Sequence, residues 1–225
     1  MFHTMKPSKI NGIYRTHNKL FTINPRTCKG QSVYNEKIIK KHNVEYRSWN
    51  PYRSKFAAAI LNGLKDVTLA DFSHILYLGA ATGTTVSHVS DTVQEKGLVF
   101  AVESSAVAMK KLLTVTEHRN NIIPILSDAF HPERYQAIVP KVEFIYQDIS
   151  QRNQAEIFMS NINTFLMNKG QGLLMVKARS IDVSLKPEQA YKQVIQKLRD
   201  HDLKIHNIIT LEPYKKDHAC IHITQ

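Results

Sequence analysis

Apolar and polar residues follow two different periods along the chain, and the change falls near residue 50. Residues 1–50 contain short alternating runs such as GIYRTHNKLFTI, which are interrupted by turn residues at Asn24-Pro25 and Lys29-Gly30. Alternation with period two is typical of half-buried antiparallel strands. We therefore predict a small N-terminal β domain over residues 1–50, followed by a larger domain over residues 51–225.

In the larger domain, strand patterns alternate with helical patterns. A helix is expected to begin near Ser54, and strands follow at ILYLG, LVFAVE, IIPILSDA, VEFIYQDI and GLLMVKAR. A helix is expected after ILYLG through about Thr92, and a loop with a short helix is expected to about Val139. Further helices are expected over SSAVAMKKLLTVTEHR, QAEIFMSNINTFLMN and PEQAYKQVIQKLRDH. This alternation predicts an α/β, Rossmann-like fold, whose mostly parallel sheet has helices on both faces. Two last strands, in KIHNIITLEPYKKDHACIHIT, predict a C-terminal antiparallel hairpin at one edge.

Composition narrows the class of protein. Of 225 residues, 43% are hydrophobic, and 30 Lys and Arg against 19 Asp and Glu give a net charge of +11. Such an excess favours a polyanionic partner, and a merely basic soluble protein is the alternative. Two cysteines, Cys28 and Cys220, form neither a disulfide framework nor a metal-ligand cluster, so we expect no metal. Without a signal-peptide pattern or a spanning apolar run, we expect a cytoplasmic protein that does not enter a membrane.

The stretch ILYLGAATGTTVSHVSD joins the first strand of the larger domain to a helix through a turn of small residues, which lets a ligand approach the backbone. Its glycines, Gly79 and Gly83, do not follow the G-x-G-x-x-G spacing of dinucleotide-binding turns. S-adenosylmethionine has no pyrophosphate and suits the turn better, because Thr84 and Thr85 offer hydroxyl groups to its amino-acid part. A nicotinamide-dependent oxidoreductase and a turn without a ligand are the alternatives.

Polar residues stand at the ends of the following strands. Glu103 closes LVFAVE and can accept hydrogen bonds from a ribose diol, while Asp128, with the backbone of Ala129, can read an adenine edge. Asp148 and Lys177 close the next two strands. The packing of a sheet does not itself demand acids at these positions, so they favour an adenosine-containing cofactor.

The chain resembles the fibrillarins, which are box C/D RNA-guided ribose 2′-O-methyltransferases. The resemblance covers almost the whole length, in family order, through SVYNEK, EYRSWNPYRSKFAAAILNGL, ILYLGAATGTTVSHVSD, RNNIIPILSDAFHPERY, FIYQDISQRNQAEIF, VKARSID and LEPYKKDHA. Asn35 and Thr82 stand where Gly and Ser are common, and neither change removes a functional group. The resemblance implies the fold of S-adenosylmethionine-dependent methyltransferases, S-adenosyl-L-methionine as cofactor and, without a glycine/arginine-rich extension, the shorter archaeal form.

The resemblance also assigns roles to residues by motif. Thr84 and Thr85 would contact the methionine part of the cofactor, and Glu103 with Ser104 would hold its ribose. The complete cofactor set would be Gly79, Ala80, Thr84, Thr85, Glu103, Ser104, Asp128, Ala129, Asp148, Ile149, Ser150 and Gln151. The catalytic Lys-Asp-Lys-His set of the family would be Lys55, Asp148, Lys177 and His218.

Each catalytic candidate also has a simpler explanation. Asp148 can cap the following helix, Lys55 can contact a phosphate and His218 can be an ordinary hairpin residue. Lys177 is the hardest to explain in this way, because a lysine near a core needs a partner or a function. It would act either as a base, which requires a lysine pKa well below about 10.4, or as a charged stabiliser of the developing alkoxide. The sequence does not separate these two roles.

The expected function is transfer of a methyl group to a ribose 2′-hydroxyl in pre-rRNA, with tRNA as a further candidate substrate. No sequence-reading RNA module is visible, since the chain has no RNP motif, KH signature or zinc knuckle. The resemblance therefore implies box C/D guide RNA and target RNA, a Nop-type scaffold protein and a kink-turn-binding ribosomal-protein-like subunit as partners. A non-catalytic RNA-binding scaffold is the alternative function, and the acids and Lys177 at the strand ends argue against it.

Overall fold

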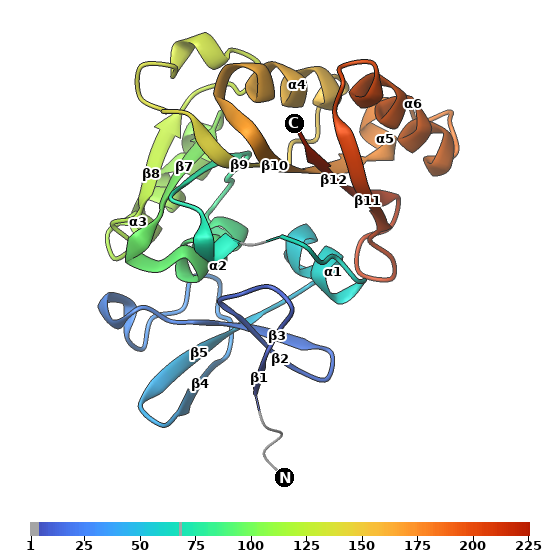
Figure 1. Ribbon diagram of the computed structural model, residues 1–225. Coiled ribbons are helices and arrows are strands. Elements are labelled where there is room, and N and C mark those ends of the chain that lie inside the picture. Colours follow the sequence, from blue (N-terminus) through green and yellow to red (C-terminus); the bar gives the residue numbers. More distant parts are fainter. Residues whose placement is uncertain (1–4, 68) are drawn as a thin grey trace.

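A small antiparallel sheet forms the N-terminal part of the protein. The structure, a computed structural model, describes residues 5–67 and 69–225, so residues 1–4 of the predicted N-terminal domain lie outside the described residues. The sheet contains β1 (Lys6–Pro7), β2 (Ile13–Thr16), β3 (Lys19–Ile23), β4 (Ile38–Lys41) and β5 (Val44–Trp49), in the order β1-β2-β3-β5-β4 (Figure 1). The predicted antiparallel unit is therefore confirmed.

A second sheet has seven strands and carries the rest of the fold. Its strands are β6 (His74–Leu78), β7 (Leu98–Glu103), β8 (Ile122–Leu126), β9 (Val142–Gln147), β10 (Leu166–Lys177), β11 (Lys204–Thr210) and β12 (His218–Thr224). They follow the order β11-β12-β10-β9-β6-β7-β8. Strands β6 to β10 pair in parallel, whereas β12 is antiparallel to both β10 and β11. The α/β sheet and its C-terminal antiparallel hairpin are confirmed.

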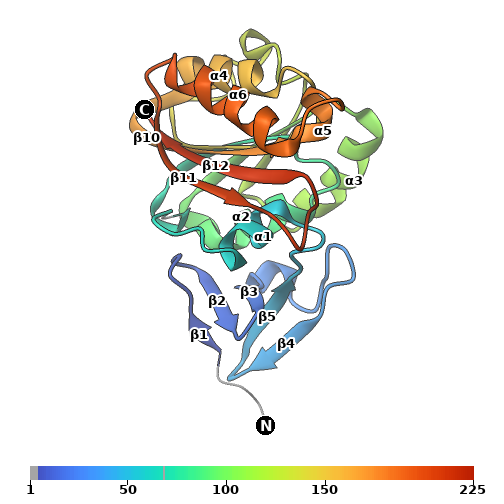
Figure 2. The same cartoon turned by 90° about the vertical axis from the view of Figure 1, so that its right-hand side faces the viewer.

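Helices cover both faces of the seven-stranded sheet. Helices α1 (Lys55–Leu61), α2 (Thr84–Val93) and α3 (Ala106–Thr116) lie on the face toward the N-terminal sheet. Helices α4 (Gln154–Phe165), α5 (Ala178–Ile181) and α6 (Pro187–Arg199) lie on the opposite face (Figure 2). Short 3₁₀ turns occur at Arg26–Cys28, Leu69–Asp71, Gln94–Lys96 and Pro132–Arg134. One hydrophobic cluster fills each face of the sheet, so the parallel strands are buried on both sides.

Several elements differ from the sequence prediction in where they end or in their type. Helix α4 ends at Phe165 rather than continuing through Asn168, because Leu166 is buried and already pairs with Val142 of β9. Tertiary packing here outweighs local helical preference. Strand β10 ends at Lys177, and the next residues form the short helix α5. The helix expected before Val139 is only the 3₁₀ turn at Pro132–Arg134.

Buried charges fasten the N-terminal sheet to the larger domain. The guanidinium of Arg47 on β5 is completely buried and donates to Glu36 Oε1 at 2.6 Å and to Asp91 Oδ2 of α2 at 2.5 Å. Asp91 also accepts a hydrogen bond from Arg119 Nε at 3.1 Å. The ring of Trp49, at the end of β5, stacks on His88 of α2 with a centroid separation of 4.8 Å. These contacts fix the end of β5, and therefore the segment that leads into α1 and Lys55.

Candidate functional site

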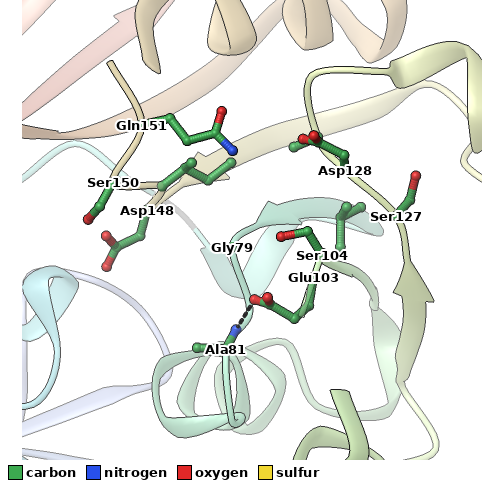
Figure 3. A pocket seen from close by; sticks show the side chains of 12 residues that line it. Gly79, Ala81, Glu103, Ser104, Ser127, Asp128, Asp148, Ser150 and Gln151 are labelled. Carbon is green, nitrogen blue, oxygen red and sulfur yellow. Dashed lines mark hydrogen bonds between the residues drawn. The ribbon is translucent and has the colours of Figure 1, made fainter. Parts of the chain in front are cut away.

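A cavity of about 260 Å³ lies where the order of the parallel strands reverses, at the carboxyl ends of β6, β7, β8 and β9 (Figure 3). Ligands bind at this position in open α/β sheets. The cavity is lined by Gly79, Ala81, Val102, Glu103, Ser104, Ser127, Asp128, Ala129, Asp148, Ile149, Ser150 and Gln151. All of the predicted cofactor residues line it except Ala80, Thr84 and Thr85.

The turn after β6 approaches the end of β9 so closely that only glycine fits at its first position. Gly79 has φ +85°, and a Cβ there would lie less than 3.0 Å from the carbonyl oxygen of Asp148. The amide of Asp148 donates to the carbonyl of Leu78 at 2.9 Å. The amides of Gly79 and Ala80 both donate to the carbonyl of Val102, at 2.9 and 3.1 Å. The turn is therefore held between β7 and β9 and forms one wall of the cavity.

The Glu103 carboxylate is fixed at the base of the cavity by backbone amides. Its two oxygens accept hydrogen bonds from the amides of Ala81 and Ser105, each at 2.8 Å (Figure 3). A carboxylate has about four lone-pair sites, so acceptor capacity remains for a diol. Ala81 itself is a lining residue that the sequence reasoning missed, although it lies within the turn that was singled out.

The loop after β8 closes the other side of the cavity. Asp128 Oδ1 accepts from the amide of Phe130 at 3.0 Å, and the carbonyl of Ala129 accepts from Asn161 Nδ2 of α4 at 2.8 Å. The Tyr135 hydroxyl donates to Asn161 Oδ1 at 2.5 Å, and burial raises the pKa of this tyrosine. Ser127 also lines the cavity and was missed. Its position directly before Asp128 was the available signal.

Of the predicted cofactor residues outside the cavity lining, Thr85 has a visible structural task. Ala80 is buried, and Thr84 is the first residue of α2. The Thr85 hydroxyl donates to Ser54 Oγ at 3.0 Å, and the same Ser54 oxygen accepts from the amide of Ala57 and caps α1. Thr85 therefore couples the start of α1 to the start of α2 and helps to position Lys55.

An ion pair joins α1 to the end of β9. The Lys55 ammonium donates to Asp148 Oδ1, and the two side chains are only 13% and 20% exposed. The Asp148 carboxylate is turned away from Glu103 and Asp128, at one end of the cavity (Figure 3). Partial burial weakens solvent screening, so this contact is stronger than an exposed ion pair. The Asp148 carboxylate is therefore engaged by a cation from α1.

Lys177 and His218 face each other across the β10–β12 pair. The backbone of Lys177 is held by Gln154, which accepts from its amide at 3.0 Å and donates to its carbonyl at 3.2 Å. His218 Nδ1 donates to the carbonyl of Lys216 at 2.5 Å. Burial lowers the pKa of His218 and this hydrogen bond raises it. The charges of Lys55 and Lys177 also lower the pKa, and the charge of Asp148 raises it. All four predicted catalytic residues are therefore close enough to act on one another.

Lys215 is a further site residue that sequence reasoning did not assign. Its Nζ donates to the carbonyl of Tyr52 at 2.6 Å. Burial lowers the pKa of Lys215, and the charges of Lys55 and Arg53 lower it further, while Asp148 opposes them. The motif LEPYKKDHA contains this lysine, but the motif alone does not tell which of its two lysines reaches the Tyr52 carbonyl.

The described residues contain neither a cluster of metal ligands nor a membrane-spanning helix. Within residues 5–67 and 69–225, no group of three or more His, Cys, Asp or Glu side chains is placed to hold a metal ion. No helix in these ranges is long and apolar enough to cross a bilayer. Cys28 and Cys220 are buried free thiols, and burial raises the pKa of Cys220.

The strand order, with the single reversed strand β12, and a cavity carrying Glu103 and Asp128 at successive strand ends define an S-adenosylmethionine-dependent methyltransferase. The profile of the Fibrillarin family matches residues 5–225. The chain therefore belongs to the fibrillarin family.

Similar proteins and similar solved structures are also fibrillarins. A fibrillarin-like rRNA/tRNA 2′-O-methyltransferase of Thermococcus onnurineus is 50% identical over 190 residues, 84% of each chain. The structure of the Methanococcus jannaschii fibrillarin pre-rRNA processing protein has a TM-score of 0.93 and 42% identity, covering 99% of this chain and 98% of that one.

Two further similar structures contain a ligand or a partner protein. Aeropyrum pernix fibrillarin, described in complex with natively bound S-adenosyl-L-methionine, has a TM-score of 0.88 at 40% identity and covers 98% and 97% of the two chains. A fibrillarin/Nop5p complex has a TM-score of 0.87 at 44% identity, covering 97% and 99%.

Proposed function

We propose that this protein is an RNA-guided ribose 2′-O-methyltransferase of box C/D ribonucleoproteins. It transfers the methyl group of S-adenosylmethionine to a ribose 2′-hydroxyl of rRNA. Because similar proteins are rRNA/tRNA 2′-O-methyltransferases, tRNA is a further proposed substrate. The observation that carries this proposal is the Lys55–Asp148 ion pair at one end of the cavity, with Lys177 and His218 beside it.

The cavity suits S-adenosylmethionine in chemistry as well as in position. Glu103 keeps free lone pairs for the ribose diol, and Asp128 lies across the cavity where an adenine amino group can donate to it. The closely approaching backbone at Gly79 leaves room for the amino-acid part near Ile149 and Gln151. When bound, this cofactor supplies an electrophilic methyl group on a sulfonium.

The catalytic residues would act on the RNA hydroxyl. A ribose 2′-hydroxyl is a weak acid and must lose its proton, at least partly, as it attacks. Lys177 would either accept this proton or stabilise the developing alkoxide as a cation. Burial lowers the pKa of His218, which favours the neutral ring, and because Nδ1 donates to the Lys216 carbonyl, Nε2 would be the acceptor of that neutral form. Lys55 would hold Asp148 in place, and alignment of the reacting atoms would supply much of the acceleration.

The partners follow from the family and from the charge of the chain. The fibrillarin/Nop5p complex supports a Nop-type scaffold protein as the partner here. Guide RNA, target RNA and a kink-turn-binding subunit complete the proposed assembly, and the net charge of +11 favours contact with RNA. The similarity to archaeal relatives supports a cytoplasmic location as part of the same proposal.

Reconstitution tests this function. The purified chain, guide RNA, a Nop-type protein and a kink-turn-binding protein are combined with target RNA and labelled S-adenosylmethionine, and 2′-O-methyl positions are mapped. We expect one nucleotide to be modified, and its position to move when the guide sequence is changed. Cofactor binding without any methyl transfer in the complete assembly would favour the non-catalytic scaffold instead.

A further inference from the structure

The rim of the site beside Asp148 is built from two loops that are far apart in the sequence. Lys215, in the loop between β11 and β12, donates to the carbonyl of Tyr52, in the turn before α1, at 2.6 Å. The Tyr52 ring packs edge-to-face on Tyr214, with a centroid separation of 5.2 Å. Asn62 at the end of α1 donates to two carbonyls of the same β11–β12 loop, at 2.7 Å each. The Lys215 ammonium is therefore held in place before substrate arrives.

Two cations on this rim have no acidic partner among the residues that the structure describes. Lys215 is partly buried, and among the described residues its ammonium makes no ion pair with a carboxylate. The nearby carboxylate of Asp148 is already engaged by Lys55. Arg53 is exposed, and its guanidinium lies over the Tyr34 ring at 5.2 Å, with no ion pair to a described acidic residue. Partial burial of an uncompensated ammonium costs free energy, which an anionic ligand would offset.

We propose that Lys215 and Arg53 form a subsite for a phosphodiester of the RNA substrate, next to the ribose that is methylated. This inference rests on the proposed function. The phosphate on the 3′ side of a ribose is joined to the 2′-oxygen through only two carbon atoms and one oxygen atom. It therefore lies beside the reacting hydroxyl and brings a negative charge close to Asp148. Lys215 and Arg53 are the cations placed to balance that charge, and in doing so they orient the ribose. Both are positioning residues and take no part in moving the proton.

A neutral linkage in the substrate tests the subsite directly. Target RNAs carry one methylphosphonate, which has no charge, at the linkage 3′ to the target nucleotide, 5′ to it, or several nucleotides away. Single-turnover methylation is measured in the reconstituted assembly with the wild type and with Lys215→Gln. In the wild type, a neutral linkage adjacent to the target should slow transfer about tenfold or more, the scale of one lost charge-assisted hydrogen bond. The distant linkage should have little effect.

The variant then decides whether Lys215 reads that phosphate. Lys215→Gln should slow transfer on ordinary RNA by a similar factor and lose the sensitivity to the adjacent neutral linkage, while Lys215→Arg restores part of both. Arg53→Gln should behave in the same direction. Lys192→Gln removes one exposed charge from α6 and serves as the control for net charge. Calorimetry with S-adenosylmethionine checks that each variant is folded.

The outcomes separate this inference from the proposed function. Wild-type protein that does not methylate ordinary RNA would overturn the proposed function itself. Wild-type protein that methylates RNA but ignores neutral linkages on both sides of the target would overturn the subsite alone. The subsite is also overturned if Lys215→Gln keeps the full wild-type sensitivity to the adjacent methylphosphonate.

Discussion

Lys55, the first residue of α1, and Asp148, the residue after β9, form an ion pair across a sequence separation of 93 positions. Ser54 fixes the Lys55 end by capping α1, and the Leu78 carbonyl fixes the Asp148 end through its amide. The pair is thus anchored to two rigid elements at the end of the cofactor cavity. Its geometry is set by the packing of these two elements.

If Lys55 and Asp148 act as one unit, removing either should abolish most of the activity. We expect Asp148→Asn to reduce methyl transfer by about 10²-fold or more, and Lys55→Met to have an effect of similar scale. The double variant should transfer methyl groups only slightly more slowly than the less active of the two single variants, because the second change removes a contact already broken. Single-turnover rates in the reconstituted assembly measure this coupling. Losses that simply multiply would show that the two residues act separately.

Lys177 should be required for transfer but not for cofactor binding. Lys177→Ala is expected to reduce methyl transfer by about 10²-fold or more while S-adenosylmethionine still binds. Lys177→Arg separates its two candidate roles, because arginine stays charged and cannot accept a proton. Substantial activity in the arginine variant would support electrostatic stabilisation. Near-normal transfer in both variants would remove Lys177 from the mechanism.

Gly79 offers a matched test of the close approach beneath the cofactor. Gly79→Ala should weaken S-adenosylmethionine binding at least about tenfold, because its Cβ collides with the Asp148 carbonyl and displaces the turn. Gly30→Ala is the control, since Gly30 also has positive φ, +75°, but a Cβ there meets no atom within 4 Å. Calorimetric titration of both variants measures the difference. Equal affinities would show that the turn relaxes at no cost.

The stability of the protein should fall in weak acid because His222 is buried on β12. Burial lowers its pKa to about 4, and its neighbour His206 lowers it as well, while Asp66 opposes. The unfolded chain takes up a proton below about pH 6.5, whereas the folded chain does so only near pH 4. The contribution of His222 is therefore complete above about pH 6.5 and is lost as the pH falls toward 4.

Urea denaturation across this pH range measures the effect. His88 and His218 also have pKa values lowered by burial, so they contribute in the same direction. For that reason the informative quantity is the slope of the unfolding free energy with pH. His222→Gln should flatten this slope relative to the wild type, and an unchanged slope would mean that His222 takes up its proton equally readily in both states.

The order of strands and helices and the position of the cofactor turn follow from the sequence alone. Hydrophobic periodicity is a local signal, so it identified β6 to β10 and their helices from residues close together in the chain. Parallel strands place their carboxyl ends at one edge, so Glu103, Asp128 and Asp148 could be assigned to one site before any contact was known. Sequence signals were weakest at element ends. Leu166 leaves α4 for β10 because burial against β9 outweighs helical preference.

Only the tertiary structure decided which side chains meet. Periodicity records that a residue is buried or exposed, but it carries no information about its partner many residues away. The structure joins Lys55 to Asp148, turns the Thr85 hydroxyl toward Ser54 and brings Lys215 to the Tyr52 carbonyl. Each contact depends on how α1, the parallel sheet and the β11–β12 loop pack together. Candidate site residues could thus be proposed from the sequence, whereas their pairing results from long-range packing.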